Sequence, residues 1–211
     1  MLNRTACVEA ADSRECHEVK VPDKRGKVIV ISGPSGVGKG TLCAEILKRV
    51  DDTCLSISAT TRERGASEME GKDYYFLTRE TFEARRAGGL FLEWAEVFGN
   101  YYGTPKDKLN EMLTTGKSVL LEIDVQGGKQ AKAAYPDAIM IFILPPDEHA
   151  LYTRIQGRGR DSEDSVQVRL SEARAETSVA WDHYEHRVVN DDLEQAVHAI
   201  VRIIRAASAA C

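Results

Sequence analysis

The amino-acid sequence predicts an α/β fold in which a parallel β-sheet is flanked by helices. Short apolar runs, of which residues 28–31 and 118–123 are the clearest, alternate with helical patterns along most of the chain. This alternation is typical of parallel sheets with helical crossovers, and uninterrupted apolar runs indicate strands buried on both faces. Residues 59–103 break the rhythm with short aromatic strands. We therefore expect them to form an insertion at the ligand edge of the sheet.

The first strand leads directly into a glycine-rich loop. Residues 28–41 read Val-Ile-Val-Ile-Ser-Gly-Pro-Ser-Gly-Val-Gly-Lys-Gly-Thr, and an amphipathic helix begins at Thr41. In such a loop backbone N–H groups can surround a phosphate, the helix N-terminus adds positive potential, and Lys39 adds a mobile charge. The phosphate-loop pattern has a hydroxyl after the lysine, whereas here Gly40 follows and Thr41 comes one residue later. The stretch predicts a nucleoside triphosphate site, and the alternative is a glycine-rich turn with an incidental lysine.

The remaining elements follow from periodicity and from residues that begin or end helices. Further strands are expected at residues 54–58, 72–77, 90–98, 118–123, 138–144 and 186–190. Four helices are expected to begin after the N-cap residues Thr78, Thr104, Ser162 and Asp191. Two more helices are expected over residues 125–134 and 147–157. Proline in the first turn after Thr104 supports a helix start there, and Gly88 and Gly116 are suited to helix ends.

Composition excludes several classes of protein. The 211 residues carry a net charge of -5, which disfavours a nucleic-acid partner, and no stretch approaches the length of a membrane span. The five cysteines are scattered and contain no C-x-x-C pair, which indicates free thiols in a reducing compartment. Residues 1–25 are polar and lack both periodicity and an apolar signal core, so we expect a poorly ordered extension. We expect a cytoplasmic protein without a membrane anchor.

The insertion holds residues suited to a second, phosphorylated substrate. Arginines and phenols gather there, and guanidinium groups match pairs of phosphate oxygens. Glu93 lies inside the otherwise apolar strand Leu-Phe-Leu-Glu-Trp, and Glu122 and Asp124 finish a core strand that can line the same crevice. The polar and aromatic residues that converge on this region are Ser58, Arg62, Arg64, Tyr74, Tyr101 and Tyr102.

At this point the chain resembles the guanylate kinases over about residues 26–206. The segments that carry the resemblance, in the order and spacing of that family, are 33–41, 58–62, 71–74, 91–95, 99–103, 121–127, 157–159 and 189–191. The resemblance implies transfer of the terminal phosphate of ATP to GMP, with Mg²⁺, in purine nucleotide metabolism. It also implies the fold of nucleoside monophosphate kinases: a parallel core sheet, a GMP-binding insertion over about 59–103, a lid over about 154–170, and here a tail over 207–211.

The resemblance also implies roles for individual residues. GMP would contact Ser58, Arg62, Tyr74, Glu93, Tyr102, Thr104 and Asp124. ATP would contact Gly33, Pro34, Ser35, Gly36, Val37, Gly38, Lys39, Gly40, Thr41 and, at the adenine, Asn190. Lys39, Arg158 and Arg169 would stabilise the transferring phosphoryl group, with Arg154 a further lid candidate. Thr41 would contact Mg²⁺ directly or through water.

One position departs from the family pattern Thr-Thr-Arg-x-x-Arg. Gly65 stands where the second arginine is usual, and Arg64 comes one residue earlier. The departure puts the affinity for GMP in question and does not affect the predicted reaction class.

A carboxylate at Glu93 matches the ring N–H and amino group of guanine, whereas adenine presents a lone pair there.

Two other functions compete with the enzyme. Related domains also act as protein-interaction modules, but usually with a degraded phosphate loop, whereas Gly33, Gly38 and Lys39 are all present. A sister kinase with another acceptor, such as a different nucleotide or a sugar phosphate, would share the core. Glu93, Thr104 and Asp124 together favour guanine. Several helices offer surfaces for self-association, so the sequence is compatible with a homo-oligomer.

Overall fold

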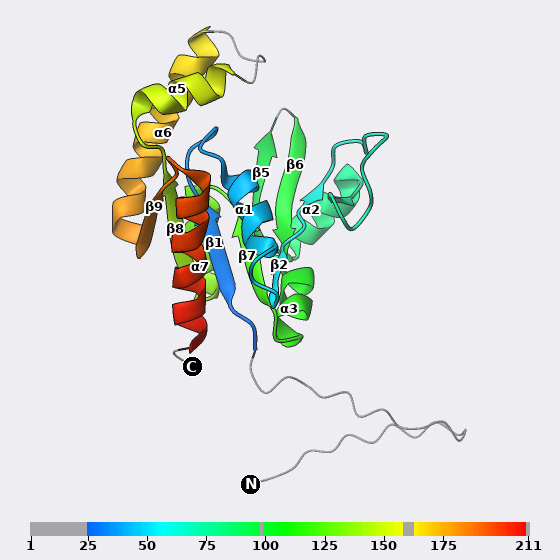
Figure 1. The fold of residues 1–211 in the computed structure, drawn as a ribbon. Coiled ribbons are helices and arrows are strands. Elements are labelled where there is room, and N and C mark those ends of the chain that lie inside the picture. The colour runs from blue at the N-terminus through cyan, green and yellow to red at the C-terminus, as the bar shows by residue number, and fades with distance from the viewer. Residues whose placement is uncertain (1–24, 98, 158–162, 210–211) are drawn as a thin grey trace, which may run out of the picture.

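A five-stranded parallel sheet forms the centre of the molecule (Figure 1). The computed structural model describes residues 25–97, 99–157 and 163–209. The strand order is β2-β7-β1-β8-β9, and every neighbouring pair is parallel. The strands are β1 (Val28–Ser32), β2 (Thr53–Leu55), β7 (Ser118–Glu122), β8 (Ile139–Leu144) and β9 (His186–Val189). This confirms the predicted α/β class.

Helices bury both faces of this sheet, which explains the uninterrupted apolar strands. Ile29 and Ile31 face α1 (Lys39–Leu47) and α7 (Leu193–Ala209) in one apolar cluster. Val28 and Val30 face the opposite way into a second cluster. The helices of that second face are α3 (Lys106–Thr114), α4 (Val125–Ala134) and the carboxyl-terminal part of α6 (Glu163–His183). The apolar area removed from water on both faces is the main stabilising term of the fold.

The predicted insertion forms a second sheet of four strands in the order β4-β3-β6-β5. Its strands are β3 (Ala59–Thr60), β4 (Tyr75–Phe76), β5 (Phe91–Val97) and β6 (Asn100–Pro105). Helix α2 (Arg79–Ala87) packs Phe82, which is fully buried, against Phe91 and Tyr101. Figure 1 shows this sheet and α2 beside the β2 and β7 edge of the core.

The single strand predicted over 54–58 is wrong, because the chain changes sheets there. Thr53–Leu55 pairs with β7 in the core, whereas Ala59–Thr60 pairs with β4 and β6 of the insertion. The backbone N–H of Ser56 still donates to the carbonyl of Leu120 at 2.8 Å before the chain leaves the core sheet. The break carries the chain from the core into the insertion.

Two predicted helix caps are also wrong, and one is confirmed. Thr78 caps α2 by accepting the N–H of Thr81 at 3.2 Å. Thr104 instead lies in β6 with its hydroxyl turned to Glu93, and Pro105 occupies the N-cap position of α3. At the start of α7 the cap is Asp192, which accepts the N–H of Gln195, and not Asp191. Ser162, the fourth predicted cap, lies outside the described residues.

Helix α5 (Glu148–Gln156) and the amino-terminal part of α6 stand over the carboxyl ends of the core strands (Figure 1). They pack together through Leu151, Ile155, Val166 and Ala173. The predicted lid over 154–170 is therefore described at its two ends, and residues 158–162 between them lie outside the description. Within the described ranges no helix combines the length and apolar character needed to cross a lipid bilayer.

Candidate functional site

The glycine-rich loop joins β1 to α1 at the carboxyl edge of the core sheet, as the sequence predicts. Gly33 must lack a side chain, because a Cβ there would lie 2.5 Å from the carbonyl oxygen of Ile143. Gly38, the N-cap of α1, has a φ of 99°, in the left-handed region that favours glycine. The loop therefore adopts a compact turn that ends at the N-terminus of a helix, where backbone N–H groups and the helix dipole favour an anion.

Lys39 extends over this loop. Its ammonium group donates to the backbone carbonyls of Gly33 and, at 3.1 Å, of Pro34. Both acceptors are neutral loop carbonyls, so the positive charge is held directly at the phosphate loop.

A carboxylate stands beside the position where the phosphate-loop pattern has its hydroxyl. An ideal Cβ on Gly40 would lie 3.6 Å from Oε2 of Glu122 and 3.7 Å from Oε1. Glu122 ends β7 in register with Ile31, and Thr41 follows in the first turn of α1. Burial, and secondly the negative charge of Glu122, raises the pKa of Cys43 to about 12. Cys43 is therefore a neutral thiol in the core. The side chains next to Gly40 that carry oxygen atoms are those of Glu122 and Thr41.

The three residues expected at the guanine base lie together. Thr104, which is 1% exposed, donates its hydroxyl proton to Oε1 of Glu93 at 2.6 Å across β5 and β6. Asp124 caps α4 by accepting the N–H of Gly127 at 2.7 Å. A Cβ on Gly127 would lie 3.1 Å from Cγ of Glu93, so the N-terminus of α4 closely approaches that side chain. Burial, and to a smaller extent Asp124, raises the pKa of Glu93.

The residues expected at the acceptor phosphate are also brought together, around Arg62. Its guanidinium carbon lies 5.5 Å from the ring centre of Tyr74, and that ring meets Tyr102 edge-on at 5.9 Å. Ser58 adjoins β3, and its carbonyl accepts the N–H of Tyr75. Tyr101, another candidate phenol, instead belongs to the core of the insertion and accepts a hydrogen bond from Arg79. Alternation along β6 separates the two neighbouring tyrosines.

Glu68 is the residue at this site that sequence reasoning missed. Its Oε1 accepts from Arg62 at 2.6 Å, and its Oε2 accepts the backbone N–H of Gly65 at 2.7 Å. The hydrogen bonds from Arg62 and Gly65, the former the stronger, lower the pKa of Glu68. The departure at Gly65 thus leaves one arginine facing one carboxylate, while Arg64 is exposed. No periodicity links residues 62 and 68, so the sequence carries no signal for this pair.

One arginine of the lid lies at the phosphate loop. Arg169 on α6 reaches the phosphate loop, where its Nη1 lies 3.5 Å from the hydroxyl of Ser35. Arg158 lies outside the described residues. Arg154 on α5 is not a freely solvated charge, because its Nη2 donates to the backbone carbonyl of Asn190 at 2.9 Å.

A second carboxylate, Glu176 on α6, also approaches the loop. Its Oε2 is buried and has no hydrogen-bond partner in the described part of the chain. Burial raises the pKa of Glu176, while the nearby positive charge of Lys39 opposes that rise. Glu176 lies seven residues after Arg169, which places both on one face of α6. That spacing is the signal by which the sequence could have indicated it.

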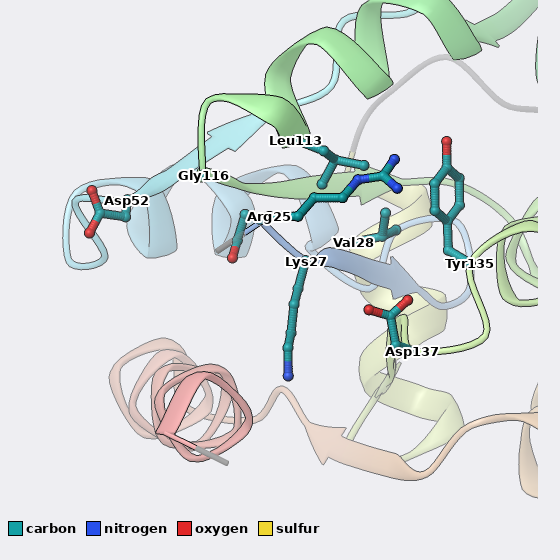
Figure 2. Close-up of a pocket in the computed structure, with 10 residues that line it drawn as sticks. Arg25, Lys27, Val28, Asp52, Leu113, Gly116, Tyr135 and Asp137 are labelled. Atoms are coloured by element: carbon teal, nitrogen blue, oxygen red, sulfur yellow. The ribbon is translucent and has the colours of Figure 1, made fainter. Parts of the chain in front are cut away.

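A pocket of about 440 Å³ at the opposite end of the sheet is not part of this site (Figure 2). It is lined by the segment before β1 and by neighbours that include Asp52, Tyr135 and Asp137. Its two basic groups are already engaged: Arg25 donates to Asn110, and Lys27 donates to the carbonyl of Ala207. The glycine-rich loop, Glu122 and Asp124 lie instead at the carboxyl ends of the core strands.

Comparisons with known proteins agree with this geometry. The family model described as guanylate kinase matches residues 25–207. A guanylate kinase of Synechocystis sp. is 49% identical over 180 residues, which cover 85% of this chain and 94% of the relative. One of Carboxydothermus hydrogenoformans is 46% identical, covering 86% and 89%. A crystal structure of guanylate kinase from Anaplasma phagocytophilum superposes with a TM-score of 0.67 at 35% identity, covering 87% of this chain and 86% of that one.

Proposed function

This chain belongs to the guanylate kinase family, and on that premise we propose how its own residues divide the transfer of a phosphoryl group. Family membership gives the reaction: the terminal phosphate of ATP passes to GMP, and the products are ADP and GDP. The substrates are thus two nucleotides, one at the phosphate loop and one at the insertion.

The phosphate loop, residues 33–41, binds the phosphates of ATP in this proposal. The N–H groups of the loop and the N-terminus of α1 face the anion, and Lys39 moves from the carbonyls of Gly33 and Pro34 onto phosphate oxygens. The exchange is favourable because a lysine hydrogen bond to an anion is stronger than one to a neutral carbonyl.

The insertion binds GMP at both of its ends. Glu93 accepts from the ring N–H and amino group of guanine, while the hydroxyl of Thr104 fixes the carboxylate and Asp124 closes the pocket. The GMP phosphate lies against Arg62, with hydroxyl groups from Ser58, Tyr74 and Tyr102 around it. Adenine would set a lone pair against the Glu93 carboxylate, which disfavours AMP.

A divalent metal accompanies ATP in kinases of this family, and we propose Mg²⁺. No group of three or more His, Cys, Asp or Glu side chains is placed to hold a metal among the residues described. One carboxylate with nucleotide phosphates and water suits Mg²⁺, and Glu122 beside Gly40 provides it, with Thr41 as a further oxygen donor. When bound, Mg²⁺ would neutralise charge on the phosphate oxygens.

Transfer proceeds in line and requires no general base, because the attacking oxygen belongs to the already ionised GMP phosphate. Lys39 and Arg169, both in contact with the loop, stabilise negative charge on the transferring group in this proposal, and the sequence adds Arg158 as a further candidate. Closure of the lid excludes water and so suppresses hydrolysis of ATP.

The free thiols of Cys43 and Cys54 support the further proposal that the protein works in a reducing compartment, the cytoplasm.

The hydrogen bond of 2.6 Å between Thr104 and the largely buried Glu93 is the observation that carries the proposed assignment of the acceptor site. It is tested by comparing Thr104→Val, which removes the hydroxyl, with Thr104→Ser, which keeps it. We expect Thr104→Val to lower kcat/KM for GMP about tenfold with KM for ATP unchanged, because one buried hydrogen bond is lost. Thr104→Ser should stay within a few-fold of the unmodified enzyme. Equal loss in both variants would contradict the proposal.

A further inference from the structure

Asn190 connects the last strand of the core sheet to the phosphate loop. It directly follows β9, and its backbone N–H donates to the carbonyl of Leu144 at 2.8 Å. Its side-chain Nδ2 donates to the carbonyl of Val37 at 2.8 Å, between residues 153 positions apart in sequence. Asn190 is 7% exposed, so this is a buried hydrogen bond. The side chain that the resemblance assigns to adenine therefore already donates its Nδ2 hydrogen to the phosphate loop.

This hydrogen bond fixes the orientation of one peptide unit in the loop. The carbonyl of Val37 and the N–H of Gly38 belong to the same planar trans peptide, so they point in opposite directions. Holding the carbonyl on Asn190 turns the N–H of Gly38 to the other side of that peptide. A carbonyl turned into a phosphate cradle would repel the anion, whereas an N–H there attracts it.

The sequence of the loop leaves room for this contact. A Cβ on Gly38 would lie 2.7 Å from Nδ2 of Asn190, so a larger residue there would displace this amide. The α1 helix that begins here has no side-chain hydrogen bond at its N-cap. The buried amide of Asn190 supports the Val37–Gly38 peptide from its carbonyl side.

The same asparagine also receives a contact from the lid. Arg154 on α5 donates its Nη2 to the carbonyl of Asn190 at 2.9 Å. Its Nη1 is buried and has no hydrogen-bond partner within the described ranges. Arg154, Asn190 and Val37 thus form a continuous polar connection from α5 to the phosphate loop.

We propose that Asn190 is a positioning residue that orients the Val37–Gly38 peptide toward the donor phosphates and ties the loop to α5, in place of a contact with adenine. The proposal rests on the proposed function in one respect: residues 33–41 bind the phosphates of ATP. It reassigns Asn190 from recognising the base to organising the phosphate site.

The test separates phosphate binding from base binding. Asn190→Ala removes the amide, and Asn190→Asp keeps its shape while replacing the Nδ2 donor with an oxygen that repels the Val37 carbonyl. Asn110→Ala is the control, since it deletes an asparagine near the opposite end of the sheet. Calorimetric titrations with ATP and with inorganic tripolyphosphate, both in magnesium, measure the two affinities, and circular dichroism confirms that each variant is folded.

We expect both Asn190 variants to weaken ATP and tripolyphosphate by the same factor, about tenfold for one buried hydrogen bond. KM for ATP should rise likewise, with KM for GMP unchanged and Asn110→Ala like the unmodified enzyme. Weakened ATP binding with unchanged tripolyphosphate binding would overturn the inference, because it would show a contact with the base. Unchanged binding of both would overturn it as well. Failure of the proposed function itself looks different: Lys39→Ala would then leave ATP binding unaltered.

Discussion

Replacing Glu93 with glutamine tests the guanine site most sharply. In the folded protein Oε1 of Glu93 accepts the hydroxyl proton of Thr104 at 2.6 Å. Glutamine has nearly the same shape, but one of its two terminal groups is an NH₂ donor. That donor would meet the donors of guanine, so a charge-assisted hydrogen bond is lost.

The magnitude follows from the type of bond. A hydrogen bond to a charged group contributes about 1.5–3 kcal/mol, which corresponds to about a 10- to 150-fold loss in kcat/KM for GMP. Stability should change in the opposite direction. Burial raises the pKa of Glu93 above its ordinary value of 4.5. A carboxyl group with a raised folded-state pKa loses its stabilising contribution as pH rises through that pKa. Glu93→Gln lacks this loss and should be at least as stable at neutral pH.

The assay couples ADP formation to NADH oxidation at varied GMP, with saturating ATP and magnesium. Thermal unfolding at neutral and acidic pH gives the stability of the same preparations. A fall in kcat/KM for GMP without a fall in the unfolding temperature agrees with the reasoning. Unchanged kcat/KM would refute the role of the carboxylate, and parallel losses of activity and stability would reduce Glu93 to a structural residue.

Three further predictions concern the phosphate loop, the acceptor loop and the core. Lys39→Ala should remove most turnover while leaving GMP affinity by calorimetry largely intact, and equal loss of both would contradict its role. Gly65→Arg should lower KM for GMP about two- to tenfold in steady-state assays, since it adds a second cationic side chain beside the Arg62–Glu68 ion pair. Tyr184→Phe removes a buried hydrogen bond of 2.7 Å to Ser32. Scanning calorimetry should show an unfolding temperature lower by about 2–8 °C, and no change would mean that the hydroxyl is dispensable.

The sequence predicts the core of this molecule well because its signals are local. The apolar run at 28–31 and the glycines after it place a buried strand and a phosphate loop, and β1 and α1 follow them closely. Asp124 and Gly127 begin a helix whose predicted range, 125–134, matches α4. Periodicity and capping are properties of neighbouring residues, so they survive without tertiary information.

Thr104 shows where local signals fail. A threonine before a proline is a good N-cap, and the sequence therefore predicts a helix start at this residue. In the structure its hydroxyl bonds to Glu93 on the adjacent strand, and the helix begins without a side-chain cap. Thr104 is suited both to capping a helix and to bonding a carboxylate on the next strand, and the tertiary contact with Glu93 determines that it does the second.

Other parts of the site depend on contacts between distant segments. Asn190 reaches Val37 from the far end of the chain, and Arg169 reaches Ser35 across the lid. Glu68 holds Arg62 only because the loop between them folds back. Residue types indicated that these regions bind nucleotides, but the partner of each side chain is fixed by the sheet order and the loop path, which no local pattern encodes.

The central claim is that this chain phosphorylates GMP by reading guanine. The most direct measurement is ADP release from ATP and magnesium with GMP, AMP, UMP or CMP as the acceptor, using the full chain and equal concentrations. The account predicts rapid release with GMP and only background with the other three. Comparable release with AMP, or no release with GMP while ATP still binds, would contradict it.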